Sequence, residues 1–238
     1  RIPFLVGAVI SLVGLWIRKG AEETSQVAED IQKGETQRPG MFEFLVKYPK
    51  KALLIVGITI AGTVSYYTWT TFLPTFANLS VKFDKADALT IGTISLLFFM
   101  VLQPLVGMLS DKIGRKPILI TFGLGFTLLP VPLLGLLSNS FASLLIIQMI
   151  GMVFLSGFTS ISAAVNSESF PTRVRASGAG FPYSLTVAIF GGTAPLIGTA
   201  LLDAERGSVF PWYVSALALI STLVYIFALK ETKDQPLS

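Results

Sequence analysis

The 238-residue sequence contains neither cysteine nor histidine. Without cysteine no disulfide can form, and without either residue these positions lack the usual ligands of a zinc site. The absence of histidine also excludes a histidine-based proton relay within these residues. Functions that depend on a disulfide framework, on a typical zinc site or on histidine chemistry are therefore excluded for this stretch of chain.

Charge is the second scarce property. Charged residues make up 13% of the sequence, about half of the roughly 25% found in soluble domains, and the mean hydropathy is +0.70. A soluble core cannot absorb many long apolar segments without exposing large apolar patches, so an integral membrane protein is expected. The segments without any charged residue are 52–78, 88–110, 117–167, 176–202 and 207–229.

These uncharged segments have the lengths of membrane-spanning helices, each of which needs about 20 apolar residues. The third segment is long enough for two crossings and has a turn signal, Ser138-Asn139-Ser140, near its middle. The sequence thus predicts an all-α, polytopic transmembrane bundle with six full crossings. The predicted crossings cover residues 53–77, 89–109, 117–137, 141–165, 176–202 and 210–229.

Three other regions flank these crossings. The first apolar stretch is shorter than a crossing, so residues 1–17 are expected to be the end of a helix that begins upstream. Residues 18–51 are polar and of mixed charge, which favours a solvated loop, with 42–46 as an alternative short interfacial helix. A bundle at 52–229 and a tail at 230–238 complete the predicted domain organisation.

Basic residues are distributed unequally between the two sides of the predicted bundle. All 18 Lys and Arg residues lie on one side except Arg1, Lys82, Lys85 and Arg206. Basic residues near span ends remain in the cytoplasm. The loop before the first crossing, the loops after the second and fourth, and the C-terminal tail are therefore predicted to be cytoplasmic. The predicted location is the plasma (inner) membrane, with multiple passes.

A charged motif connects the second and third crossings. Residues 107–116 read Gly-Met-Leu-Ser-Asp-Lys-Ile-Gly-Arg-Lys and fit the pattern G-x-L-x-D-[RK]-x-G-R-[RK] at every fixed position. Gly107 allows another helix to approach closely, and Gly114 permits a tight reversal of the chain. This segment resembles the signature loop of the major facilitator superfamily.

Asp111 is an anion at the membrane edge and is expected to form one part of an ionic latch. A helix N-terminus carries partial positive charge that stabilises an anion. The fifth crossing starts directly after Arg173 and Arg175, so it offers both a helix end and two cations. We therefore expect Asp111 to pair with one of these arginines.

Arg115 and Lys116 lie in the loop directly before the third crossing. They are expected to contact lipid head groups or to pair with Glu168, which lies at the end of the fourth crossing. An Arg115–Glu168 pair would join cytoplasmic helix ends, favour an outward-facing state and break as the protein opens inward. The alternative is that the basic residues of this loop only determine topology.

Several further segments are similar to the metabolite:proton symporter branch of this superfamily. They are 1–4 (RIPF), 22–24 (EET), 167–175 (SESFPTRVR) and 190–193 (FGGT). Another set is most similar to members of the branch that carry alpha-ketoglutarate, namely 62–71 (GTVSYYTWTT), 103–107 (QPLVG), 159–162 (TSIS) and 210–213 (FPWY). The resemblance implies that the chain contains the end of the sixth helix, the central loop and helices seven to twelve of a twelve-helix protein.

The resemblance also implies a secondary active transporter, in which two six-helix bundles rock around a solute site at the membrane midplane. The implied partners are a small organic solute, protons and the lipid bilayer, with no cofactor, no metal, no nucleic acid and no catalytic residue. An N-terminal six-helix half is implied to be required. The implied solute is a dicarboxylate such as alpha-ketoglutarate, or alternatively a proline- or betaine-type osmolyte or another organic acid.

No Asp, Glu, Lys or Arg lies within the predicted crossings, although such residues are the usual mark of a substrate or proton site in a membrane. The proton-coupling residues are therefore expected in the upstream half. Hydroxyl and amide groups remain, because they hydrogen-bond carboxylates without carrying charge. The candidate solute-lining residues are Tyr66, Tyr67, Thr70, Gln103, Asn166 and Tyr183.

Structural roles compete with these assignments. The tyrosines also suit an aromatic belt at the outer interface, and we expect Trp69 to lie in that belt. Gln103 needs a hydrogen-bond partner, which helix packing can supply. Rival functions are an intramembrane enzyme, for which paired acids, histidine and Gly-x-Ser-x-Gly are lacking, and a sensor or scaffold without transport. The absence of a Walker pattern argues against an ATP-driven pump.

Overall fold

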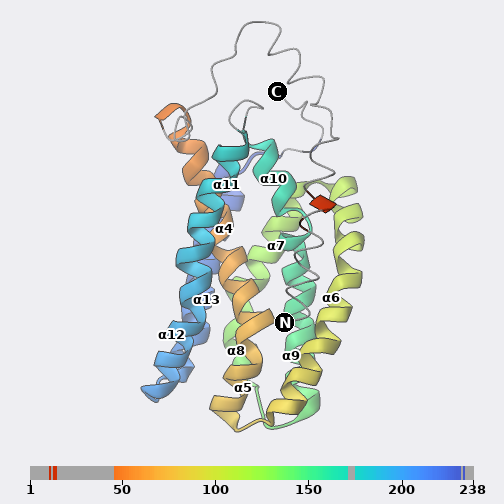
Figure 1. Ribbon diagram of the computed structural model, residues 1–238, viewed down its shortest axis with the longest axis vertical. Helices are drawn as coiled ribbons and strands as arrows, with labels where there is room; N and C mark the ends of the chain where they lie inside the picture. Colours follow the sequence, from red (N-terminus) through yellow and green to blue (C-terminus); the bar gives the residue numbers. More distant parts are fainter. Residues whose placement is uncertain (1–10, 12, 15–45, 171–174, 232, 234–238) are drawn as a thin grey trace, which may run out of the picture. The chain divides into compact units, whose positions relative to one another are not determined.

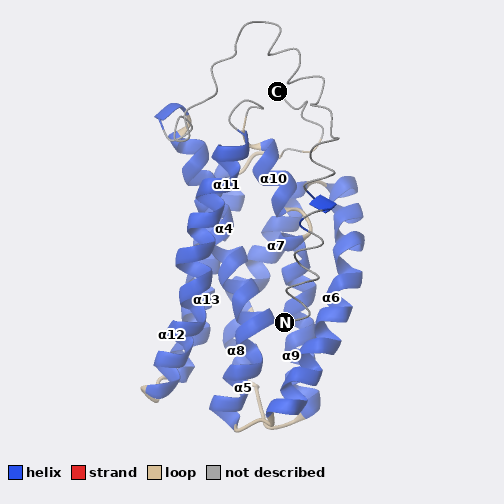
Figure 2. Ribbon diagram, viewed as in Figure 1, coloured by secondary structure: helices blue, strands red, loops and turns tan. Residues whose placement is uncertain are grey.

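In the computed structural model of the protein, the described residues are 11, 13–14, 46–170, 175–231 and 233, with the side chains of 175–177 left aside. The chain divides into two units, Arg1–Gly40 and Met41–Ser238. Every described element of the second unit is helical (Figure 2). Six helical segments there are long and apolar enough to cross a membrane. The predicted all-α bundle with six crossings is confirmed. Most of the predicted helix end at 1–17 and most of the predicted loop at 18–51 lie outside the described residues.

The first crossing contains an irregularity at its middle. It consists of α4 (Pro49–Tyr66), a wide π-helical turn (Tyr67–Phe72) and α5 (Leu73–Val81). Pro74 has no N–H to donate to the carbonyl group four residues earlier, so the regular α-helical ladder is interrupted at this point. The chain forms the wider, π-helical turn at this point.

The next two crossings differ in continuity. The second is the single helix α6 (Lys85–Ile113), whose first turn is capped by the carboxylate of Asp84 accepting hydrogen bonds from two backbone N–H groups. The third is divided into α7 (Arg115–Leu128) and α8 (Pro130–Gly135). The proline that starts α8 cannot continue the ladder of α7.

The fourth crossing consists of α9 (Phe141–Thr159) and α10 (Ser162–Glu168). The fifth repeats the pattern of the first, with α11 (Arg175–Thr186), a π-helical turn (Val187–Gly191) and α12 (Gly192–Asp203). Here too a proline, at position 195, lies four residues beyond a carbonyl of the wide turn.

The sixth crossing consists of three helical segments. It contains a 3₁₀ turn (Gly207–Val209), α13 (Phe210–Leu223) and a final π-helical turn (Val224–Ala228). Figure 1 shows α5 and α8 toward one end of the bundle and α10 and α11 toward the other. Consecutive crossings run in opposite directions, since short connections join them at alternating ends.

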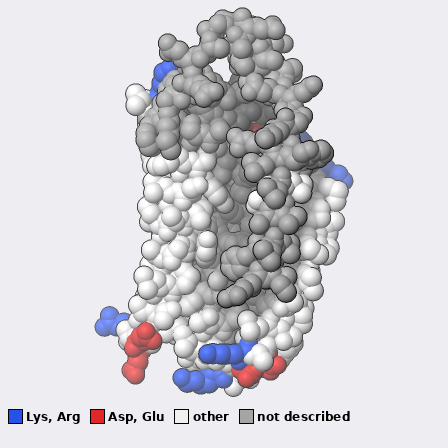
Figure 3. All heavy atoms as spheres, in the orientation of Figure 1, with Lys and Arg blue, Asp and Glu red and all other residues white. Residues whose placement is uncertain are grey.

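Charged side chains lie at the two ends of this bundle. Every described Asp, Glu, Lys and Arg falls in a connection or in a terminal turn of a crossing. Figure 3 shows Lys, Arg, Asp and Glu gathered at the lower end, with an uncharged surface above them. This is the arrangement that a hydrocarbon layer requires, because a charge at its centre is costly.

Trp69 lies in the centre of the helix packing and not in an interfacial belt. Its side chain is 1% exposed, its ring meets that of Phe126 edge-on at 5.0 Å, and its indole N–H donates to the carbonyl of Ile147 at 3.3 Å. The amide of Gln148 returns a hydrogen bond to the backbone carbonyl of Trp69. The expectation of a belt position was therefore wrong, because polar partners on α9 satisfy the indole inside the bundle.

The sixth crossing is held against α4 by hydrogen bonds from its final π-helical turn and from α13. The phenol of Tyr225, which is fully buried, donates to the carbonyl of Ile58 at 2.7 Å, and the hydroxyl of Ser221 accepts from the backbone N–H of Ala61 at 2.9 Å. In hydrocarbon, close packing and such polar bonds replace the hydrophobic effect as the forces between helices. They fix α4, which carries much of the site described below.

Gly151 provides a test of this packing. A Cβ atom at this position would overlap the indole ring of Trp69, so Gly151→Ala is expected to displace the ring and lower the free energy of unfolding by about 1–3 kcal/mol. The matched control is Gly180→Ala, where an added Cβ meets nothing within 4 Å and stability should stay equal or rise. Thermal unfolding in detergent measures both, and equal stability of the two variants would contradict the packing described.

Candidate functional site

The first candidate site is a polar cluster where α6 ends and α7 begins. Gly114 separates the two helices with a φ of +104°, a conformation that strains any residue with a Cβ atom. A Cβ at this position would also approach the carboxylate of Glu231 to 2.5 Å. Both the reversal and the contact with the tail therefore depend on glycine.

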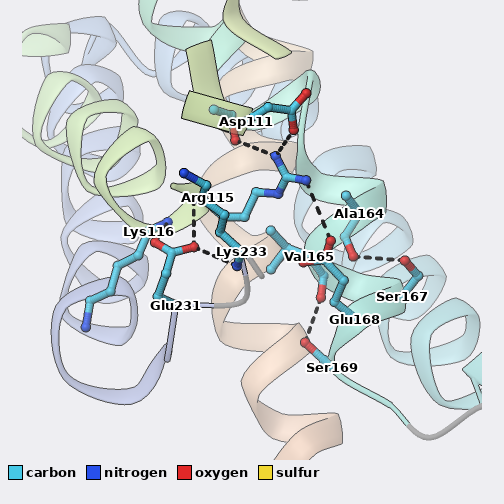
Figure 4. Close-up of polar contacts among 11 residues, drawn as sticks. Asp111, Arg115, Lys116, Ala164, Val165, Ser167, Glu168, Ser169, Glu231 and Lys233 are labelled. Carbon is cyan, nitrogen blue, oxygen red and sulfur yellow. Dashed lines mark hydrogen bonds and ion pairs between the residues drawn. The ribbon is translucent and has the colours of Figure 1, made fainter. Parts of the chain in front are cut away.

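Arg115 is the centre of this cluster (Figure 4). Its guanidinium lies 2.5 Å from the carboxylate of Asp111 and 3.0 Å from the hydroxyl of Ser110, both at the end of α6. On its other side the guanidinium lies 3.7 Å from the carboxylate of Glu168, at the end of α10. Arg115 thus joins the ends of the second, third and fourth crossings.

The two ion pairs of Arg115 differ in exposure. The side chain of Asp111 is 67% exposed, whereas those of Arg115 and Glu168 are 17% and 19% exposed. Exposed pairs contribute little, while shielded pairs interact more strongly but cost more to desolvate. Within the described part of the chain, Arg115 Nε and Glu168 Oε2 are buried without a hydrogen-bond partner. The inter-helix pair is therefore incompletely satisfied.

Asp111 and Lys116 have partners in this cluster that the sequence did not predict. Asp111 pairs with Arg115 of the following turn; Arg173 and the side chain of Arg175, its expected partners, lie outside the described residues. Lys116 donates from Nζ to the carbonyl of Ile226 at 2.9 Å and is not paired with Glu168. No described residue approaches within 4 Å of a Cβ placed on Gly107, so the expected close helix contact there is not found.

Sequence reasoning missed Glu231, which lies just after the last crossing. Its carboxylate accepts hydrogen bonds from the backbone N–H groups of Arg115 at 2.8 Å and Lys116 at 3.0 Å, the first residues of α7. An anion at a helix N-terminus satisfies otherwise unpaired donors and the helix dipole. Lys233 adds a hydrogen bond from Nζ to the carbonyl of Lys112 at 2.7 Å. Glu231 and Lys233 of the tail thus bind residues 112–116, the end of the charged motif.

The second candidate site lies midway along the bundle, beside the two π-helical turns of the first and fifth crossings. At the turn in the fifth crossing, a Cβ on Gly191 would overlap the hydroxyl of Thr63 and approach the ring of Tyr67 to 2.7 Å. The absence of a side chain therefore lets the two irregular turns meet. Wide turns of this kind occur frequently at functional sites.

A cavity of about 340 Å³ opens next to these turns, which is within the roughly 300–1,000 Å³ range of small-ligand sites. The rings of Tyr66 and Tyr67 meet edge-on with centroids 5.8 Å apart. No acidic or basic side chain is among its described walls. The lining residues are Gly62, Thr63, Tyr66, Tyr67, Phe158, Thr159, Ser162, Tyr183 and Val187.

The structure brings three of the six sequence-predicted lining residues into this cavity, namely Tyr66, Tyr67 and Tyr183. Thr70 is not part of the lining, and its hydroxyl donates to the carbonyl of Tyr66 at 2.6 Å. In a regular α-helix Thr70 would share a face with Tyr66, four residues earlier, but Thr70 lies in the π-helical turn, where that spacing changes.

The two amides predicted to line the site also lie outside the cavity wall. Gln103 donates from Nε2 to the hydroxyl of Thr159 at 2.7 Å, so it fixes a lining residue and joins α6 to α9. Asn166 is 6% exposed, and its side-chain oxygen has no partner in the described part of the chain. It lies two residues before Glu168, next to the ion cluster.

The chemistry available to these two sites is limited to binding and to charge pairing. The cavity offers hydroxyl groups and aromatic rings, and the ion cluster offers carboxylates and cations at a helix end. Among the described residues no group of three or more Asp, Glu, His or Cys side chains could hold a metal ion. The arrangement fits reversible binding of a small organic molecule at the middle of the bundle.

The contact between the tail and α7 is testable. Replacing Glu231 by Ala removes the acceptor of two backbone N–H groups, so the free energy of unfolding is expected to fall by about 1 kcal/mol. The amides of Arg115 and Lys116 should then exchange hydrogen faster, which mass spectrometry can follow locally. Lys230→Ala, a change at the neighbouring exposed position, should leave both readouts unchanged. Unaltered exchange in Glu231→Ala would contradict the cap.

Comparison with known proteins places these features in a family. The sequence pattern of the Major Facilitator Superfamily matches residues 58–238. Alpha-ketoglutarate permease of Escherichia coli (strain K12) is 34% identical over 240 residues, covering 100% of this chain and 54% of that protein. No solved structure matches the chain significantly.

Two further relatives are named for different solutes. Glycine betaine/proline/ectoine/pipecolic acid transporter OusA of Dickeya dadantii (strain 3937) is 28% identical over 248 residues, and Proline/betaine transporter of Escherichia coli (strain K12) is 26% identical over 247 residues. Each alignment covers 100% of this chain and 49% of the relative. The chain spans about half the length of the curated relatives it matches. Since the family pattern extends over most of its residues, the chain belongs to the major facilitator superfamily.

Proposed function

We propose that the chain is one half of a secondary active transporter that works by alternating access. The observation that carries this proposal is the uncharged cavity midway along the bundle of a major facilitator protein, with an ion cluster at one end. Solute sites of such transporters lie near the bilayer midplane between two repeats. In this proposal residues 1–17 end the sixth helix, 52–229 form helices seven to twelve, and the facing half of the site lies outside this chain.

The proposed solute is a dicarboxylate such as alpha-ketoglutarate, taken up together with protons. Support comes from the 34% identity with a permease named for that solute. The alternative is a proline- or betaine-type osmolyte, supported by relatives at 28% and 26% identity. No described Asp or Glu lies in the hydrocarbon part of a crossing, so the proposal assigns proton coupling to residues outside this chain.

The proposed orientation has the ion cluster and the C-terminal tail in the cytoplasm, within the plasma (inner) membrane. Support comes from the basic residues, which concentrate in the loops at that end of the bundle. The opposite end carries Lys82, Lys85 and Arg206 together with several acidic residues. Its connections are assigned to the outside.

Arg115 and Glu168 are proposed to act as a gate at the cytoplasmic end, with Asp111 holding the guanidinium in place. The pair joins α7 to α10 in the present conformation, and its buried, incompletely satisfied atoms limit how much it stabilises this state. A contact of this kind can form and break during a transport cycle. Arg173 and Arg175 are proposed to take part at the same end.

Solute flux tests the function itself. The transporter containing this chain, reconstituted in vesicles, is expected to accumulate alpha-ketoglutarate or, in the alternative, proline or glycine betaine. Accumulation should rise several-fold when a pH gradient, acidic outside, is applied, because proton entry would drive uptake. Vesicles without protein give the baseline. Flux of none of these solutes would contradict transport and favour a sensor or scaffold.

The gate can be tested by accessibility, because this chain has no native cysteine. A cysteine replacing Asn166, which is 6% exposed, should react with an impermeant maleimide only from the cytoplasmic side. Glu168→Gln weakens the pair with Arg115 and should speed labelling about 3- to 10-fold, equivalent to about 0.7–1.4 kcal/mol.

Glu205→Gln removes a carboxylate at the opposite end of the bundle and serves as the matched control. It should leave the labelling rate unchanged. An equal effect of both variants would contradict the gate. Labelling from the outer side instead would contradict the proposed orientation.

A further inference from the structure

We propose that Tyr66, Tyr67 and Tyr183 form a neutral half-site that binds a carboxylate group of the solute through their phenol O–H donors. This inference rests on the proposed function, since it concerns the transported solute. In this proposal, this half of the protein recognises the carboxylate by hydrogen bonding alone and contributes no positive charge to its binding.

The three phenols are available to bind a ligand. They come from two crossings and line one cavity, and none of their hydroxyls makes a hydrogen bond within the part of the chain that the structure describes. Tyr66 and Tyr183 are 41% and 36% exposed, so a molecule that enters the cavity can reach them. Next to them, the buried hydroxyl of Thr63 is also without a described partner.

The chemistry of the lining points to a carboxylate. An ionised carboxylate is an acceptor with about four lone-pair sites, so it can take hydrogen bonds from several donors at once. Such bonds are shorter and stronger than those between neutral groups. Among the described walls there is no acidic residue that would attract a cation. Phe158 and Val187 supply apolar surface for the carbon chain of a small acid.

The backbone explains why adjacent tyrosines can share one cavity. In a regular α-helix successive side chains point about 100° apart. The π-helical turn that begins at Tyr67 holds more residues per turn, so successive side chains there point in more similar directions. Gly191 leaves room for the ring of Tyr67, since a Cβ there would approach it to 2.7 Å. The two irregular turns thus assemble the donor set.

Each phenol can be tested by removing only its oxygen. Tyr66→Phe, Tyr67→Phe and Tyr183→Phe are expected to raise the dissociation constant for alpha-ketoglutarate or glycine betaine about 10- to 100-fold, as expected for a hydrogen bond to a charged group. The transporter containing this chain is studied in vesicles by binding and by flux. Tyr213→Phe, which removes a phenol oxygen on α13 away from the cavity, should bind as the unmodified protein does. Thermal unfolding verifies that each variant is folded.

A second comparison separates the carboxylate from the rest of the solute. Choline carries the trimethylammonium group of glycine betaine but an alcohol in place of the carboxylate, and the dimethyl ester of alpha-ketoglutarate lacks both anions. Loss of binding for these analogues, with weakened acid binding in the Phe variants, supports the half-site. Equal binding of choline and glycine betaine, or acid binding unchanged in all three folded variants, overturns it while transport itself stands. Flux of no acid or zwitterion at all overturns both the inference and the proposed function.

Discussion

The absence of water from the bilayer core is the constraint on which this structure depends. Each backbone polar group must be satisfied inside its own helix, and each charge must lie near an end of a crossing. The described crossings are helical throughout, and their charges are confined to terminal turns and connections. Polar contacts between helices, such as that from Tyr225 to the carbonyl of Ile58, therefore occur between neutral groups. The ion cluster around Arg115 exists only because it lies at the edge of this region.

The same constraint places charge pairing at the edge of the bundle and binding by neutral groups at its centre. At the edge, full charges can pair and separate, so Arg115 can join the ends of three consecutive crossings. At the centre, only neutral donors and rings are available, so selectivity must come from the number and direction of hydrogen bonds. The tail carboxylate of Glu231 acts at the edge, since it secures the N-terminus of α7 next to Arg115.

Hydropathy and charge were sufficient to predict six crossings, because the bilayer imposes these properties directly on the sequence. The same reasoning selected Tyr66, Tyr67 and Tyr183, which the structure gathers in one cavity. It could not place Thr70, because regular helix spacing does not hold where the chain forms a π-helical turn. It could not place Trp69, because the partners of the indole on α9 are distant in the sequence. Glu231 was missed because a tail acid has no periodic pattern; a carboxylate directly after the last crossing is the signal that could have revealed it.

The wide turns at Tyr67–Phe72 and Val187–Gly191 each hold one more residue than an α-helical turn of the same height would need. Removing a single residue from either would narrow the turn toward α-helical width while the segments before and after it kept their faces, although Pro74 and Pro195 would still leave the ladder interrupted there. Insertions and deletions of one residue at these two points would thus exchange the groups presented to a ligand without repacking the surrounding helices. In this scaffold, a change of specificity at the two π-helical turns therefore disturbs the helix packing least.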